Sequence, residues 1–118
     1  MNIDEIVPPR KYSVRSIEIS HCANIFLNPD EQVTFTTDSG KEYDVMKKSW
    51  GFFATPSINN RLKNFGYKTA LIKDSTGKMF ICLVEEDKVE EFHQYLELDK
   101  GKIQCWLSDV SGQLQRIP

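Results

Sequence analysis

Two strand-like segments joined by a tight turn constrain the fold of this chain more than any other feature. Tyr67–Lys73 and Lys78–Val84 flank Asp74-Ser75-Thr76-Gly77, a cluster of turn-forming residues, and this pattern predicts a β-hairpin. From Met79 to Val84 every residue is apolar. An uninterrupted apolar strand is typical of the centre of a sheet that is covered on both faces. We therefore expect this second arm to lie at the centre of the core.

A helix is predicted on each side of this hairpin. The first begins at Thr55-Pro56-Ser57, with Thr55 or Ser57 as the N-cap, and ends at Gly66. The second runs from Asp87 to Leu98, with apolar residues on one face and acidic residues in its first turn. The apolar positions of the first helix follow helical spacing at Ile58, Leu62 and Phe65.

The N-terminal half of the sequence predicts strands. Residues 1–10 contain two prolines and no periodic pattern, so we expect an extended arm. A strand is predicted from Tyr12 to Ile19, with a bulge near Ser16 because the apolar positions change parity there. Gln32–Thr37 and Glu42–Met46 alternate apolar and polar residues and predict a second hairpin.

A last strand from Ile103 to Leu107 and a loose tail over residues 108–118 complete the chain. The sequence therefore predicts one α+β domain over residues 1–118, with a mostly antiparallel sheet of about six strands and two helices. Its element order is β-β-β-α-β-β-α-β. The last six elements follow the order of a ferredoxin-like fold, and a rolled, partly closed sheet is the competing architecture.

The composition is that of an ordinary globular protein. Apolar residues make up 40% of the 118 residues and charged residues 27%, and no apolar run is long enough to cross a bilayer. Three widely spaced cysteines fit a reducing cytoplasm, so we expect a soluble, cytoplasmic protein with no membrane partner. A net charge of −2 argues against a nucleic-acid partner, because phosphate neutralisation drives such binding.

The charges are unevenly distributed along the chain. Residues 45–73 contain six basic residues and no acidic one, whereas residues 85–99 contain seven acidic residues and a single lysine. Within the basic segment, a loop with three aromatic residues leads into the first predicted helix. Backbone N–H groups at a helix start and nearby cations are suited to bind anions.

We therefore predict that a ligand site lies between Lys47 and Arg61. Arg61 is suited to pair with a carboxylate or phosphate, and an aromatic ring is suited to stack on a sugar or base. The alternative is that the polar residues only cap the helix, the lysines are solvated, and the aromatic residues close the core. The predicted ligand-binding residues are Lys47, Lys48, Trp50, Phe53, Thr55, Ser57, Asn59 and Arg61.

The run WGFFATPSINNRL from Trp50 to Leu62, followed by GYKTAL from Gly66 to Leu71, resembles a small family of uncharacterised bacterial proteins. These proteins are associated with surface-polysaccharide gene clusters. The resemblance covers residues 28–109. It implies a sugar-related role and carries over no activity, cofactor or catalytic residue.

Other chemical groups offer weaker patterns. His21 and Cys22 are adjacent, but neighbouring residues of an extended chain point to opposite faces, so they do not form a catalytic pair. His93 lies on the second predicted helix as a structural residue. No short-spaced ligand pair supports a metal site, and no cofactor is predicted.

Three hypotheses on function follow. The first is an accessory domain that binds an anionic ligand, such as a sugar acid or a nucleotide sugar, at residues 47–61. The second is a protein-interaction or homodimerisation module anchored by Trp50, Phe52 and Phe53. The third is a small enzyme that uses His21 or His93 with a carboxylate or Cys22, for which no substrate can be named.

Overall fold

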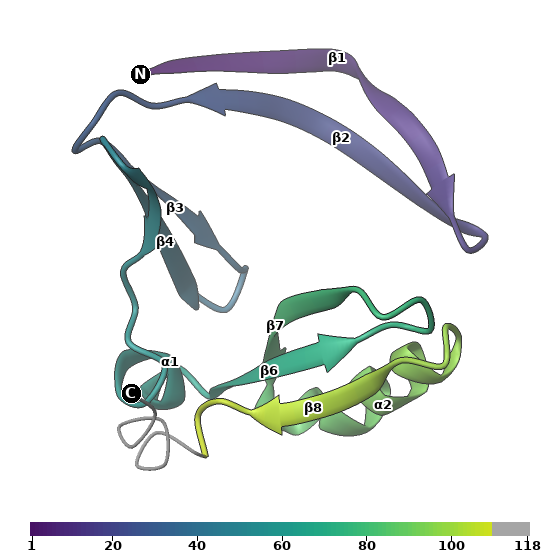
Figure 1. Ribbon diagram of the computed structural model, residues 1–118. Helices are drawn as coiled ribbons and strands as arrows, with labels where there is room; N and C mark the ends of the chain where they lie inside the picture. The colour runs from purple at the N-terminus through teal and green to yellow at the C-terminus, as the bar shows by residue number, and fades with distance from the viewer. Residues whose placement is uncertain (110–118) are drawn as a thin grey trace. The chain divides into compact units, whose positions relative to one another are not determined.

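The computed structural model describes residues 1–109, and their contacts divide the chain into two compact units (Figure 1). The N-terminal unit contains Met1–Thr55, and the C-terminal unit begins at Pro56. Strands in antiparallel sheets make up the first unit, and the second combines strands with helices, so the α+β class is confirmed. The prediction of one domain over residues 1–118 stays a prediction. Most of the predicted tail lies outside the described residues, but Ser108 at its start is buried.

The first two strands form a long two-stranded ribbon. β1 (Asn2–Val14) pairs antiparallel with β2 (Ile17–Phe26) across a two-residue turn at Arg15 and Ser16. Both turn residues have positive φ, 51° and 67°, as in a type I′ turn, whose twist matches that of two paired strands. The predicted single strand with a bulge near Ser16 is therefore wrong. The apolar positions change parity there because the chain reverses direction.

The predicted extended arm of residues 1–10 is the first part of β1. Its pairing with β2 is irregular between Glu5 and Arg10, where four residues of β1 lie opposite one residue of β2. Pro8 and Pro9 fall in this stretch and have no backbone N–H to donate. The two prolines therefore explain why the ladder is broken at this point and resumes beyond it.

A three-stranded sheet of order β3-β4-β5 completes the N-terminal unit. β3 (Gln32–Thr36) and β4 (Glu42–Lys48) form the predicted hairpin, which is confirmed. β5 (Gly51–Ala54) pairs with the end of β4, within a segment that we expected to be a loop. Two adjacent phenylalanines break the alternation that marks a half-buried strand, so the sequence pattern did not reveal β5. The described residues thus contain eight strands instead of about six.

The first helix is much shorter than predicted. α1 (Arg61–Asn64) is a single turn whose N-cap is Asn60, so a helix entry at Thr55 is wrong. The Ser57 hydroxyl accepts a hydrogen bond from the backbone N–H of Arg61 at 2.8 Å, which closes a turn before the helix. Asparagine side chains compete with helical hydrogen bonds, so Asn59 and Asn60 favour a turn over an earlier helical start.

The C-terminal unit contains a three-stranded sheet of order β7-β6-β8. β6 (Tyr67–Lys73) pairs antiparallel with β7 (Met79–Glu85) on one side and β8 (Lys102–Trp106) on the other. The hairpin prediction is confirmed, but the strand expected at the centre, β7, lies at an edge. The expectation that β7 is covered on both faces is also wrong, because Ile81 is 58% exposed.

The ferredoxin-like alternative requires a fourth strand in this sheet. In the described part of the chain, β5 pairs with β4 and not with β6 or β8. The C-terminal sheet therefore stays three-stranded. The order of elements from α1 onward, α-β-β-α-β, is as predicted.

The second helix covers one face of the C-terminal sheet. A short 3₁₀ turn, η1 (Glu86–Lys88), leads into α2 (Val89–Glu97), in agreement with the predicted helix. Leu96 of α2 packs with Ala70 and Ile72 of β6 to form the buried cluster of this unit. Four partly buried residues pack against this cluster: Cys82, Phe92, Ile103 and Trp106.

Candidate functional site

The division between the two units separates the residues of the predicted ligand site. Five of them belong to the N-terminal unit and three to the C-terminal unit. The first group is Lys47, Lys48, Trp50, Phe53 and Thr55, and the second is Ser57, Asn59 and Arg61.

The two lysines of the first group already have partners in their own sheet. The Lys48 ammonium lies 2.8 Å from Oδ1 of Asp30 and forms an ion pair with it. The Lys47 ammonium donates to the backbone carbonyl oxygen of Lys48 and lies 5.5 Å from the centre of the Phe52 ring. Because each ammonium group already contacts an oxygen atom of its own unit, less positive charge is available to attract an anionic ligand.

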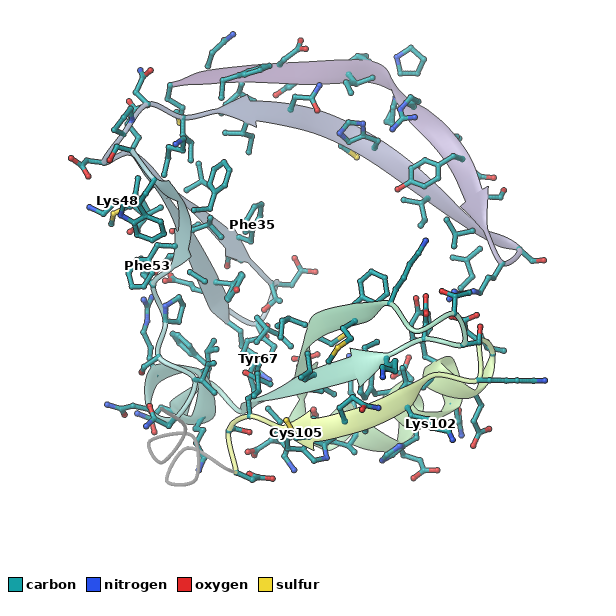
Figure 2. All side chains as sticks on the ribbon, in the orientation of Figure 1. Phe35, Lys48, Phe53, Tyr67, Lys102 and Cys105 are labelled. Atoms are coloured by element: carbon teal, nitrogen blue, oxygen red, sulfur yellow. The ribbon has the colours of Figure 1, made fainter. Side chains whose placement is uncertain are left out.

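The aromatic residues of the first group lie at the surface. Trp50 is 70% exposed, and Phe53 and Phe52 are also exposed. Within the N-terminal unit, Trp50 therefore does not close a core. Figure 2 shows Phe35 and Phe53 on opposite sides of the β3–β5 sheet, as the register requires.

The second group surrounds the one-turn helix α1. The Arg61 guanidinium lies 5.7 Å from the centre of the Phe65 ring, so it stacks on an aromatic residue of its own unit. Ser57 caps the turn as described above, and Asn59 is exposed. A four-residue helix offers only a small dipole, so α1 does not supply the anion-binding helix start that we predicted.

The groups considered for catalysis lie in different units. His21 and Cys22 are on β2, where the Cys22 thiol contacts the carbonyl oxygen of Ser20 and the His21 ring lies 3.5 Å from the Arg10 guanidinium. His93 is on α2 and exposed. Within residues 1–109, no three His, Cys, Asp or Glu side chains are grouped so that they could hold a metal ion.

A surface that we did not predict lies on one side of the ribbon. In β2, the side chains of Ile17, Ile19, His21, Ala23 and Ile25 share a face because alternate residues of a strand point the same way. The intervening residues are mostly polar. This alternation is the mark of a strand with one face covered and one face in water.

The partner strand continues the same surface. Residues directly opposite each other in an antiparallel pair share a face, so β1 contributes the residues that pair with those of β2. The ribbon face, as we call it, consists of the five β2 residues above together with Ile3, Glu5, Arg10, Tyr12 and Val14. Each isoleucine, tyrosine or valine on it is at least 37% exposed. The alternation of apolar residues is visible in the sequence. We did not assign it to two paired strands, because we interpreted the parity change near Ser16 as a bulge in one strand.

A hollow of about 420 Å³ lies beside β7 in the C-terminal unit. Val84 and Glu85 of β7 line one side, and Phe92 and Tyr95 of α2 line the other. None of the residues predicted for the ligand site lines this hollow. Most of its lining residues are aromatic or aliphatic, and the charged ones are Glu85, Lys88 and Glu91, so the hollow differs in character from the predicted anion site.

No family model, curated protein or solved structure matches the chain. The resemblance to proteins of surface-polysaccharide gene clusters therefore stays a prediction. In the described part of the chain, no helix is long and apolar enough to span a membrane.

Proposed function

We propose that this chain is a protein-interaction module that assembles with further copies of itself through the ribbon face. The observation that carries the proposal is the alternation along β2, which places Ile17, Ile19 and Ile25 on one exposed face. Apolar surface of this regularity is stabilised when it is removed from water, by about 25 cal/mol for each Å² buried. Packing against a second protein surface would bury the apolar side chains of the ribbon face.

The architecture of the ribbon supports the same conclusion. An isolated two-stranded hairpin is only marginally stable in water, and a third strand or a covering layer is needed for independent stability. β1 and β2 form a sheet of their own, because no other strand of residues 1–109 pairs with them. A layer packed on the ribbon face would supply the missing stabilisation.

Charge favours a second copy as that layer. The ribbon face carries one acidic side chain, Glu5, and a basic one, Arg10, which lie on either side of the irregular stretch of β1 and pair with the alternate β2 residues Ala23 and His21. A twofold axis between them places Glu5 of each copy beside Arg10 of the other. The same axis brings the apolar pair that contains Ile3 opposite the apolar pair that contains Tyr12. Such a self-complementary patch is what an interface between identical subunits requires.

Light scattering on the full chain tests this proposal. The parent chain is expected to form a dimer or larger assembly, whereas Ile19→Lys, which puts a charge in the middle of the ribbon face, should lower the mass of that assembly. Ser20→Lys is the matched control, because Ser20 is the next residue of β2 and points to the opposite face. It should leave the assembly intact.

Two results would contradict the proposal. A parent chain that remains monomeric when concentrated removes self-association and leaves a different protein as the partner of the ribbon face. Equal masses for the parent chain and Ile19→Lys show that assembly, if present, does not use this face. Circular dichroism of each variant confirms that the comparison is made between folded chains.

A further inference from the structure

We propose that β7 pairs antiparallel with β7 of a second copy of this chain, which joins two C-terminal sheets into one continuous sheet. This interface lies in the C-terminal unit and is separate from the ribbon face. It therefore goes beyond the proposed function and does not rest on it.

β7 presents an edge that a sheet normally protects. Among the described residues only β6 pairs with it, and that pairing runs from Met79 to Glu85 without a bulge. The strand contains six consecutive apolar residues, Met79 to Val84, with no proline or charge among them. Natural edge strands are usually short, charged, bulged or covered, because an open apolar edge pairs with other chains. The sequence of β7 is that of a central strand. In the proposed pair β7 has β6 on one side and β7 of the second copy on the other, so it becomes a central strand.

The charges that flank β7 fit a twofold antiparallel pair. With the axis at Cys82, the midpoint of the strand, Lys78 of each copy lies opposite Glu86 of the other. The positive end of one strand thus meets the negative end of its partner. Oppositely charged cross-strand neighbours stabilise a sheet, whereas the parallel arrangement would place like charges together.

The hollow beside β7 fits a side chain that the same register delivers. Phe80 is 49% exposed and lies on the same face of β7 as Cys82 and Val84, the face that α2 covers. In the proposed pair, Phe80 of the second copy lies opposite Val84, which lines the hollow with Phe92. A ring placed there removes exposed aromatic surface from both copies. Each strand thus offers both a protruding ring and a space for one.

Oxidative cross-linking of the full chain tests the register. Cys22→Ser and Cys105→Ser leave Cys82 as the remaining thiol. Two Cys82 residues on the axis lie directly opposite each other, at the separation of about 4.5–5.5 Å between Cβ atoms from which a disulfide forms with little movement. A covalent dimer is expected on copper-phenanthroline oxidation. The reaction is run at alkaline pH, since burial raises the pKa of the Cys82 thiol.

A shifted cysteine provides the matched control. In the same Cys22→Ser and Cys105→Ser chain with Cys82→Ala and Ile81→Cys added, the two new thiols lie diagonally, about 7–8 Å apart, so the cross-linked fraction should fall by about tenfold. Mixing this chain with one that carries Cys82→Ala and Leu83→Cys should restore the cross-link, because positions 81 and 83 are opposite in the proposed register. Circular dichroism verifies that each variant is folded.

The outcomes separate this proposal from assembly through the ribbon face. The Cys82 cross-link is expected to persist when Ile19→Lys is added, and its loss there would show that only the ribbon face brings the chains together. If the chain that keeps Cys82 as its remaining thiol stays monomeric under oxidation, the proposal is overturned, and a different protein becomes the candidate partner of the β7 edge. Equal cross-linking by the Ile81→Cys chain alone overturns it as well, because contact without register would then explain the dimer.

Discussion

Val14 and Ile17 lie directly opposite each other at the end of the β1–β2 pair, and only the turn residues Arg15 and Ser16 separate them in the sequence. Their pairing places two apolar side chains on the same face at the tip of the ribbon. It also requires both turn residues to adopt positive φ. Glycine and asparagine enter that conformation at low cost, whereas arginine and serine do so at a higher one.

Replacing Arg15-Ser16 with Asn-Gly is therefore expected to stabilise the ribbon. Each residue forced into the left-handed region costs about 1–2 kcal/mol, and the replacement should recover part of this in the free energy of unfolding. Chemical denaturation followed by circular dichroism measures the change. Arg15→Lys keeps the charge and the backbone cost, so it should leave the stability near that of the parent chain. A loss of stability with Asn-Gly would contradict the turn geometry.

The N-terminal half shows why the sequence predicts elements better than their connections. The parity change between Val14 and Ile17 fits both a bulge in one strand and a turn between two, and a single strand of Tyr12–Ile19 was the wrong choice. No glycine or asparagine marks the turn, so the usual local signal is missing. The β3–β4 hairpin, which has Gly40 at positive φ in its turn, was predicted correctly.

The C-terminal half shows a different limit. The apolar run in β7 correctly identified a strand, but it predicted a central one, whereas the described chain places β7 at an edge. Composition reports the surroundings in which a strand is stable, and those surroundings can include a second chain. A wrong prediction for an isolated chain can thus be informative about its assembly. The helix start predicted at Thr55 was wrong for a local reason, since Asn59 and Asn60 favour a turn and α1 begins only at Arg61.

The buried cluster of the C-terminal unit predicts a large difference between two leucines of similar sequence position. Leu96 is 6% exposed and packs against Ala70 and Ile72, so Leu96→Ala should lower the free energy of unfolding by about 2–5 kcal/mol. Leu98, two residues later, is 66% exposed, and the same truncation there should have a small effect. Equal losses in thermal denaturation would contradict the packing of α2.

The anionic ligand predicted from the sequence has its own test. If the site is correct, Lys47→Ala and Arg61→Ala should each weaken the binding of a sugar acid or nucleotide sugar, because each removes a positive charge that pairs with the anion. Lys63→Ala is the control, since Lys63 is exposed on the same helix as Arg61 and was not assigned to the site. Calorimetry provides the measurement. Binding that is unchanged in all three variants would remove the anion site.

Acid should destabilise the β6–β7 hairpin through Asp74. Its Oδ1 accepts hydrogen bonds from the Thr76 hydroxyl and from the backbone N–H groups of Thr76 and Lys78, at 2.8–2.9 Å. These bonds, the one from the Thr76 hydroxyl above all, lower the pKa of Asp74 below its ordinary value of 3.8. A carboxylate whose pKa is lowered in the folded chain stabilises the fold above the unfolded pKa. That stabilisation is lost as the pH falls through the folded pKa.

Asp74→Asn should therefore reduce the loss of stability that occurs as the pH falls below about 4, because the amide has no proton to take up there. Melting temperatures measured over this range for the variant and the parent chain give the comparison. Part of the acid sensitivity should remain, since the backbone N–H of Asn28 and the terminal ammonium group lower the pKa of Glu31 in the same direction. Asp38→Asn, in the turn of the other hairpin, controls for the removal of one acidic group. If it changes the pH dependence as much as Asp74→Asn does, the hydrogen bonds to Asp74 are not the cause.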